Sequence, residues 1–225
     1  MYSGNPLLKP EQTDFFEGAI FYKKLASLKV NYSKTKNSIQ TVIRQLDESS
    51  LVSMATYANL ESTEALNVTL SLPYQAGRFT TFNIISYTKN FVNSDLEGVT
   101  FDLKKPFWFF YSYNEFKLPG SWSFEVTGSY NTSGLMGIFA FRPKLNISAS
   151  IKKELIQNKL TVHLSANDIF NRDIVRTSTS FNNFYLKYRG FEDNRYLRLS
   201  VRYNLGNLKN LTKSKTMDSR IKVEQ

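Results

Sequence analysis

A strict alternation of apolar and polar residues constrains the fold of this chain more than any other feature. After Arg195, leucine, valine and tyrosine occupy the odd positions up to Leu205, and mainly arginine, serine and asparagine occupy the even ones. An extended strand places successive side chains on opposite faces, whereas a helix would need a period of 3.6 residues. The same alternation runs through 66–72, 122–131, 145–152 and 159–167. The pattern therefore predicts an all-β chain.

Turn residues divide the alternating segments into strands that follow one another as a meander. Short connections alternate with longer polar ones, and short connections join antiparallel neighbours. Pro143 cannot donate a ladder hydrogen bond and predicts either a bulge or a stretch without a partner on that side. A kink is expected at Asn171–Asp173 and a bend at Gly190. We predict about eight to nine long strands, over 13–24, 27–46, 51–73, 78–92, 105–118, 121–132, 136–156, 158–189 and 194–206.

The composition excludes several kinds of site. The chain has no cysteine and one histidine, which excludes disulfide scaffolds, thiolate metal sites, cysteine nucleophiles and histidine clusters. Lysine and arginine number 29 against 19 aspartate and glutamate, giving a formal charge of +10. A nucleic-acid partner would require these basic residues to cluster on one surface, but most are scattered singly along the chain. We therefore expect no nucleic-acid partner, no metal and no cofactor.

Two all-β architectures show this alternation, a soluble sandwich and a transmembrane barrel. The strands reach the roughly 9–11 residues that a tilted strand needs to cross a bilayer. Aromatic residues end the apolar faces, for example Tyr74, Phe91, Phe107 and Tyr203. Short turns on one side with long loops on the other are typical of outer-membrane barrels, whose apolar face meets lipid and whose polar face meets the lumen. These features favour an antiparallel transmembrane β-barrel.

Three ordered motifs resemble those of TonB-dependent receptors. The segment 195–206 is similar to the closing strand of these receptors, with Leu205 where the family usually carries an aromatic residue. The tail from Asn207 resembles the polar basic extension of the outer-membrane β-barrel family within that group. The segment 4–11 resembles a Gly-Asn-Pro-x-Leu-Lys-Pro-Glu motif that precedes a late strand, and 167–171 resembles a late Asn-Asp-x-Phe-Asn signature; the matching residues are Gly4, Asn5, Pro6, Leu8, Lys9, Pro10, Glu11, Asn167, Asp168, Phe170 and Asn171.

The resemblance covers nearly the whole chain and implies a function. Such receptors bind a scarce nutrient outside the cell and import it with energy relayed by TonB, through a 22-stranded barrel closed by an N-terminal plug. The chain then corresponds to the C-terminal third: residues 1–206 form part of the barrel wall, and 207–225 form a basic, disordered periplasmic tail. The implied location is the bacterial outer membrane, and the implied activity is transport without catalysis.

The same resemblance implies the partners of the chain. They are outer-membrane lipid, the remaining strands and plug of the receptor and, through the plug, the TonB system. An alternative is a self-contained small outer-membrane barrel with a structural or adhesion role. A gene region upstream of Met1 that encodes a plug would distinguish the receptor from the small barrel.

Polar residues of the alternating strands are expected to line the lumen of the barrel; among them are Glu125, Lys159, His163, Arg198 and Arg202. His163 shares a strand face with Ser165, but side chains two positions apart lie about 6.5–7 Å apart along a strand, beyond hydrogen-bond reach. A hydrolase that uses His163 is a third hypothesis, although only a cross-strand acid such as Glu125 would be available to orient the imidazole.

Two further features have alternative interpretations. Asp168 with its neighbouring asparagines offers oxygen ligands for calcium, but these residues also favour an Asx-type turn, which is the interpretation we prefer. The aromatic run Phe107–Tyr111 would suit a ligand-stacking platform. Because a strand sends alternate rings to opposite faces, we expect an interfacial girdle instead, with one or two rings toward the lumen.

Overall fold

The protein is described by a computed structural model that covers residues 3–23, 25–45, 53–96, 98–156, 159–181, 184–190 and 193–205. None of the described residues forms a helix that could span a membrane. The strands are β1 (Gln12–Tyr22), β2 (Ala26–Gln45), β3 (Ser53–Ala76), β4 (Phe79–Leu96), β5 (Val99–Leu118), β6 (Trp122–Asn131), β7 (Gly134–Met136), β8 (Phe139–Phe141), β9 (Lys144–Ile156), β10 (Leu160–Asn167), β11 (Arg176–Phe181), β12 (Phe184–Arg189) and β13 (Tyr196–Tyr203). The expected tail at 207–225 lies outside the described residues.

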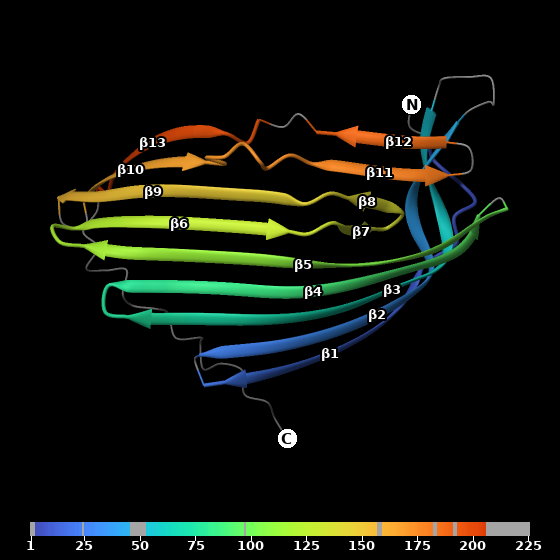
Figure 1. Ribbon diagram of the computed structural model, residues 1–225, viewed down its shortest axis with the longest axis horizontal. Coiled ribbons are helices and arrows are strands. Elements are labelled where there is room, and N and C mark those ends of the chain that lie inside the picture. Colours follow the sequence, from blue (N-terminus) through green and yellow to red (C-terminus); the bar gives the residue numbers. More distant parts are fainter. Residues whose placement is uncertain are drawn as a thin grey trace, which may run out of the picture.

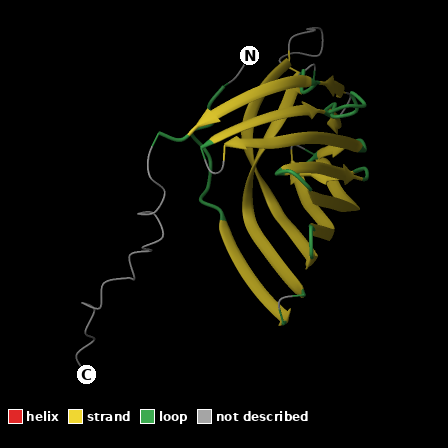
Figure 2. Cartoon of the chain, turned by 90° about the vertical axis from the view of Figure 1, so that its left-hand side faces the viewer, coloured by secondary structure: helices red, strands yellow, loops and turns green. Residues whose placement is uncertain are grey.

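Nine of these strands form one antiparallel sheet in the order β1-β2-β3-β4-β5-β6-β9-β10-β13 (Figure 1). Consecutive strands of the sheet are neighbours throughout, as a meander requires. The sheet curves into an open trough, with β1 and β13 at its two edges (Figure 2). The prediction of an all-β antiparallel fold is thus confirmed.

The cross-strand register sorts side chains into one apolar and one polar face that run across all nine strands. Ile20, Leu28, Leu70, Ile85 and Phe110 follow one another in a single row of paired positions. The adjacent positions on the same strands belong to the other face, because the side-chain period of a strand is two. Apolar side chains on the first face are largely exposed, with Ile20 at 71% and Leu199 at 66%. The sheet therefore has no core of its own on this face.

The connections at the two ends of the sheet differ in length. At one end, brief turns join β1 to β2, β3 to β4 and β5 to β6, and left-handed backbone at Lys23, Gly77 and Gly120 closes them. At the other end, two segments leave the nine-stranded sheet, one between β6 and β9 and one between β10 and β13. Together these two excursions form a second sheet in the order β12-β11-β8-β7. This is the predicted asymmetry of short turns and long connections.

Two of the predicted long strands are wrong. The segment 136–156 is divided into β7, β8 and β9, because Gly137 has a φ of +57° and Pro143 cannot donate to a ladder. The segment 158–189 comprises β10, β11 and β12, and a tight corner at Asp168–Asn171 separates β10 from β11. The alternation persists on both sides of each break, but the pieces belong to different sheets.

The sequence predicts that one strand ends at residue 92 and that the next begins at residue 105, and this predicted break between β4 and β5 is also wrong. Asn93 pairs with Asp102 and Leu96 pairs with Val99, so the two strands continue beyond their apolar parts to a tight turn. Backbone hydrogen bonds satisfy the main chain of these polar residues as well as they do in apolar segments.

Buried apolar side chains gather at the end of the sheet with the long connections. Val42 of β2, Leu60 of β3, Val92 of β4 and Ile138 between β7 and β8 are each at most 3% exposed and pack together with Ala58. Gly134 of β7 lies against Phe107 of β5, where an added Cβ would approach the ring within 2.6 Å. The β2–β3 hairpin and the β7–β8 hairpin are therefore fixed to one another and to β4 and β5.

Candidate functional site: the polar face and two motif corners

The predicted lumen-facing residues Glu125, His163, Arg198 and Arg202 all occupy polar-face positions of β6, β10 and β13. Lys159 lies in the turn before β10, where its N–H donates to the carbonyl of Ile156 at 2.9 Å. The structure thus brings four of the five residues onto one face. That this face lines a lumen stays a prediction.

His163 and Glu125 border the same hollow, of about 200 Å³, together with Ser150, Ser165 and Tyr196. The hydroxyl of Ser150 donates to Glu125 Oε2 at 3.3 Å. The cross-strand neighbours of His163 are a lysine, Lys152, and a serine on β13. Among the described residues, no hydrogen bond joins His163 to Ser165 or to Glu125. The hollow therefore holds the residue types of a hydrolase without the contacts that would activate a hydroxyl.

The aromatic run of β5 divides between the two faces. Trp108 and Phe110 lie on the apolar face, where Trp108 meets Tyr87 at a centroid distance of 5.0 Å and Phe110 meets Tyr130 at 6.4 Å. Phe107, Phe109 and Tyr111 occupy the polar face, which is three rings where one or two were expected. Phe107 is used there to pack against Phe141 of β8 at 5.0 Å.

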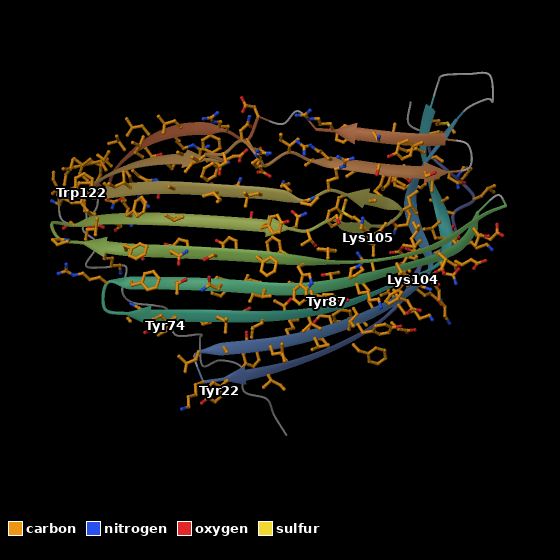
Figure 3. All side chains as sticks on the ribbon, in the orientation of Figure 1. Tyr22, Tyr74, Tyr87, Lys104, Lys105 and Trp122 are labelled. Carbon is orange, nitrogen blue, oxygen red and sulfur yellow. The ribbon has the colours of Figure 1, made fainter. Side chains whose placement is uncertain are left out.

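Aromatic residues also mark the two margins of the apolar face. Tyr22, Tyr74 and Trp122 lie near the end with the short turns, and Tyr87 lies farther along the strands (Figure 3). On β6, the stretch from Trp122 to Tyr130 has the length that a tilted strand needs to cross a bilayer, roughly 9–11 residues. The apolar face is therefore a band bounded by rings, as in outer-membrane barrels.

The N-terminal motif packs on the part of the β2–β3 hairpin that lies away from the short turns. Asn5 Nδ2 donates to the carbonyl of Tyr57 at 2.9 Å, and Asn5 Oδ1 accepts from the N–H of Leu7. The amide of Asn59 accepts from the N–H of Lys9 at 2.7 Å and donates to its carbonyl at 2.9 Å. Of the other motif residues, Leu8 is half-buried and Gly4, Pro6 and Pro10 are exposed.

The same motif also supports a break in the β2–β3 ladder. Asn37 has a φ of +51°, and the carbonyl of Asn37 accepts a hydrogen bond from Asn59 Nδ2 at 2.7 Å. Glu11 Oε2 accepts from the N–H of Ile39 at 3.0 Å. Side chains thereby satisfy backbone groups at the point where the regular pairing is interrupted. The motif holds the bent part of the hairpin in place.

The second motif forms the corner at which the chain leaves β10. Asp168 is 1% exposed, has a φ of +45°, and accepts from the N–H groups of Arg172 at 2.9 Å and Asp173 at 3.1 Å. Asn171 also has left-handed backbone, and its N–H donates to the carbonyl of Asp168. Phe170 is exposed. This is the turn that the sequence favours over a calcium site.

Asp173 closes the base of the excursion that carries β11 and β12. It pairs with Lys144 at 2.5 Å and accepts from Asn146 at 2.8 Å and Asn194 at 3.2 Å. Asn167 Nδ2 donates to the carbonyl of Asn194 at 2.6 Å, so the start and the end of the excursion are tied together. Burial alone would raise the pKa of Asp173, but the hydrogen bonds and charge of Lys144 and the asparagines lower the pKa below its usual value.

We expect Asp168→Ala to destabilise the folded protein by about 2–4 kcal/mol, because two backbone N–H groups lose a buried charged acceptor. Asp168→Asn is the matched control, since asparagine tolerates left-handed backbone and keeps one acceptor. The loss for Asp168→Asn should be about half as large. Urea unfolding of the intact protein in detergent measures both variants. An alanine variant as stable as the wild type would contradict a structural role for the carboxylate.

Sequence reasoning missed several residues that build these corners. Asn59 and Asn194 lie far in the sequence from the motifs they support, and no periodic pattern distinguishes them. Asp173 lies within the kink expected at Asn171–Asp173, but the sequence does not indicate its contacts with Lys144, Asn146 and Asn194. Among the described residues, no group of three or more histidine, aspartate and glutamate side chains is placed to hold a metal ion.

Comparison with known proteins agrees with this architecture. The model of the outer membrane protein beta-barrel family matches residues 1–203, which include the whole nine-stranded sheet and both corners. Neither the curated proteins nor the solved structures gave a match. The chain therefore belongs to the outer membrane protein β-barrel family, and its location is the bacterial outer membrane.

Proposed function

We propose that this chain forms the C-terminal part of the barrel wall of a TonB-dependent receptor that imports a scarce nutrient. Its partners are the remaining barrel strands, a plug within the lumen and the TonB system that contacts the plug. The proposal rests on the resemblance of both corner motifs to that group and on one feature of the sheet, the direction of its edge strands.

The edge strands β1 and β13 run in the same direction. β1 ends at the short turn that leads into β2, and β13 ends beside the turn before β10, where the N–H of Asn204 donates to the carbonyl of Lys159. Direct closure of β1 onto β13 would create a parallel pair in an otherwise antiparallel sheet. Bacterial barrels of a single chain have an even number of antiparallel strands. An odd number of further strands completes this wall, as in a 22-stranded receptor.

The polar face suits a lumen that is filled by a folded domain. Glu115 of β5 and Glu125 of β6 are directly opposite each other, and like charges in this position destabilise a sheet. Basic side chains of a plug would compensate these carboxylates. The wall offers cationic side chains of its own on β13, Arg198 and Arg202, which would contact acidic plug residues.

A transport protein requires no catalytic group, so we expect His163→Ala to leave assembly and hydrolytic activity unchanged. General-base assistance typically contributes about 10²–10⁴-fold to a rate, so a catalytic role would be plain in an assay with ester and phospholipid substrates. Ser165→Ala serves as the matched control. A hydrolytic rate that either substitution abolishes would overturn this assignment.

Binding of the periplasmic domain of TonB to the intact gene product tests the proposal. The product is purified from outer membranes in detergent, and binding is measured by isothermal titration. We expect a saturable complex that requires the part of the protein preceding this wall. A folded intact protein that does not bind TonB would instead support the self-contained structural or adhesion barrel.

A further inference from the structure

Three arginines form a row across the second sheet, which we call the arginine row. Arg176 of β11 is directly opposite Arg189 of β12. On its other side β11 pairs with β8, and the N–H of Arg142, the residue after β8, donates to the carbonyl of Arg176 at 3.0 Å. Lys187 is two residues from Arg189 and therefore on the same face of β12. Four cationic side chains from three adjacent segments thus share one face of this sheet.

The opposite face of the second sheet packs against the rest of the protein. Phe141 of β8 contacts Phe107 of β5 at a centroid distance of 5.0 Å. Thr179 of β11 is 4% exposed, and its hydroxyl donates to the carbonyl of Ile138 in the buried cluster at 3.2 Å. Phe141 and Thr179 alternate along their strands with the residues of the arginine row, so the row lies on the other face. The row is therefore outside the packed core.

The arginine row and Lys187 line one hollow of about 420 Å³. Tyr185 also lines this hollow, and the Nζ of Lys187 lies 5.2 Å from the centre of its ring. None of the described residues around the hollow is acidic. Arginine and lysine side chains only donate hydrogen bonds, and a tyrosine hydroxyl can donate as well. The hollow therefore offers a ligand positive charge and several donors.

The arrangement of the arginines is unfavourable for the sheet by itself. Like charges in directly opposite positions of a sheet destabilise it. On the main sheet, cross-strand lysines lie beside carboxylates instead, as Lys29 does with Glu17 at 2.6 Å and Lys34 with Glu64 at 2.8 Å. In the second sheet, Arg176 has an arginine on each side. A bound anion would compensate this repulsion.

The geometry of the row suits a phosphate group. Directly opposite side chains have Cβ atoms about 4.5–5.5 Å apart, so neighbouring guanidinium groups can reach one anion together. A guanidinium presents its N–H donors as a planar fork that matches carboxylate and phosphate oxygens. A carboxylate has two oxygens and fits one fork, whereas a phosphate monoester has three acceptor oxygens and nearly two negative charges. Two arginines can therefore share one phosphate.

The hollow is at the end of the wall with the long connections, because β8, β11 and β12 all belong to the two excursions (Figure 1). The long connections of outer-membrane barrels are extracellular. We propose that the arginine row binds a phosphate-bearing ligand on the extracellular side. The phosphate belongs to a soluble ligand or to a lipid headgroup, and the experiment distinguishes these two sources. The inference depends on the outer-membrane location and not on the receptor function.

Two phosphate probes test the site in the intact protein, purified in a neutral detergent. The soluble probe is tripolyphosphate, and its binding is measured by isothermal titration. The lipid probe is phosphatidic acid in mixed micelles, measured by native mass spectrometry against zwitterionic phosphatidylcholine. Saturable binding of tripolyphosphate would assign a soluble ligand, and binding of phosphatidic acid alone would assign a lipid headgroup. Binding of neither probe would overturn the proposal.

A double variant tests whether the arginine row holds the probe. Arg142→Gln with Arg176→Gln should weaken binding at least tenfold, because two guanidinium groups lose their charge-assisted hydrogen bonds to the phosphate. The matched control is Arg78→Gln, an exposed arginine in the short turn between β3 and β4 at the other end of the sheet. The control should bind as the wild type does. Unchanged affinity in the double variant, or an equal loss in the control, would contradict the proposal.

The stability of the double variant separates binding from structural support. Without ligand, Arg142→Gln with Arg176→Gln should be at least as stable to urea as the wild type, because directly opposed like charges are removed. Affinity and stability are thus expected to change in opposite directions or affinity alone to fall. A double variant less stable than the wild type would show that these arginines hold the sheet together, and would contradict a binding role.

Discussion

Replacing Leu199 by arginine is expected to prevent most of the intact protein from assembling. Leu199 is on the apolar face of β13 and is 66% exposed, so the arginine would face lipid. An arginine near the bilayer midplane costs about 2–4 kcal/mol when it faces lipid. Ser200→Arg is the matched control, because Ser200 is the next residue on the polar face and its arginine would stay hydrated. The folded fraction is measured by heat-modifiable electrophoretic mobility.

Equal losses for Leu199→Arg and Ser200→Arg would mean that the two faces of β13 are wrongly assigned. A normal folded fraction for both variants would exclude contact between this strand and lipid.

Residues 1–225 expressed alone in water are expected to aggregate. Exposed apolar side chains run across the sheet, for example Ile20 at 71% and Leu197 at 72%. The edge strands β1 and β13 also leave one side of their backbones unpaired, which invites association with other chains. Size-exclusion chromatography should give material in the void volume without detergent and dispersed protein with it. A monodisperse, cooperatively unfolding protein in water would contradict the lipid-facing assignment.

Much of the wall could be predicted from the sequence because its hairpins pair strands that follow one another directly along the chain. The alternation in 66–72 and the short turn near Gly77 predict β3 and β4, and the register pairs Leu70 with Ile85 as that pattern requires. The same local information assigns Glu125, His163 and Arg198 to one face. Neither inference needs contacts between distant segments.

The second sheet could not be predicted, because its pairing is not local. β11 pairs with β8, and Thr177 is opposite Phe141 across a large separation in sequence. The alternation in β11 is the same as in a strand of the main sheet, so the pattern does not tell which sheet the strand joins. The corner motifs were recognised, but their supporting contacts, such as Asn59 to Lys9, depend on the bent hairpin.

The arginine row of the second sheet shows a different limit. Arg142, Arg176 and Arg189 are far apart in the sequence, and basic residues scattered in this way indicate no binding site. The row appears only when β11 pairs with β12 on one side and with β8 on the other.

Disulfide formation between engineered cysteines tests most directly whether this sheet is an open part of a larger wall. Two pairs are positive controls because the residues are direct cross-strand partners: Gly18 with Val30 between β1 and β2, and Val162 with Val201 between β10 and β13. The test pairs combine Phe16, Gly18 or Ile20 of β1 with Leu199 or Val201 of β13. In the intact protein, oxidation should link both control pairs within one chain and none of the test pairs. An efficient intramolecular link between β1 and β13 would show that the nine strands close on themselves, and would contradict this account.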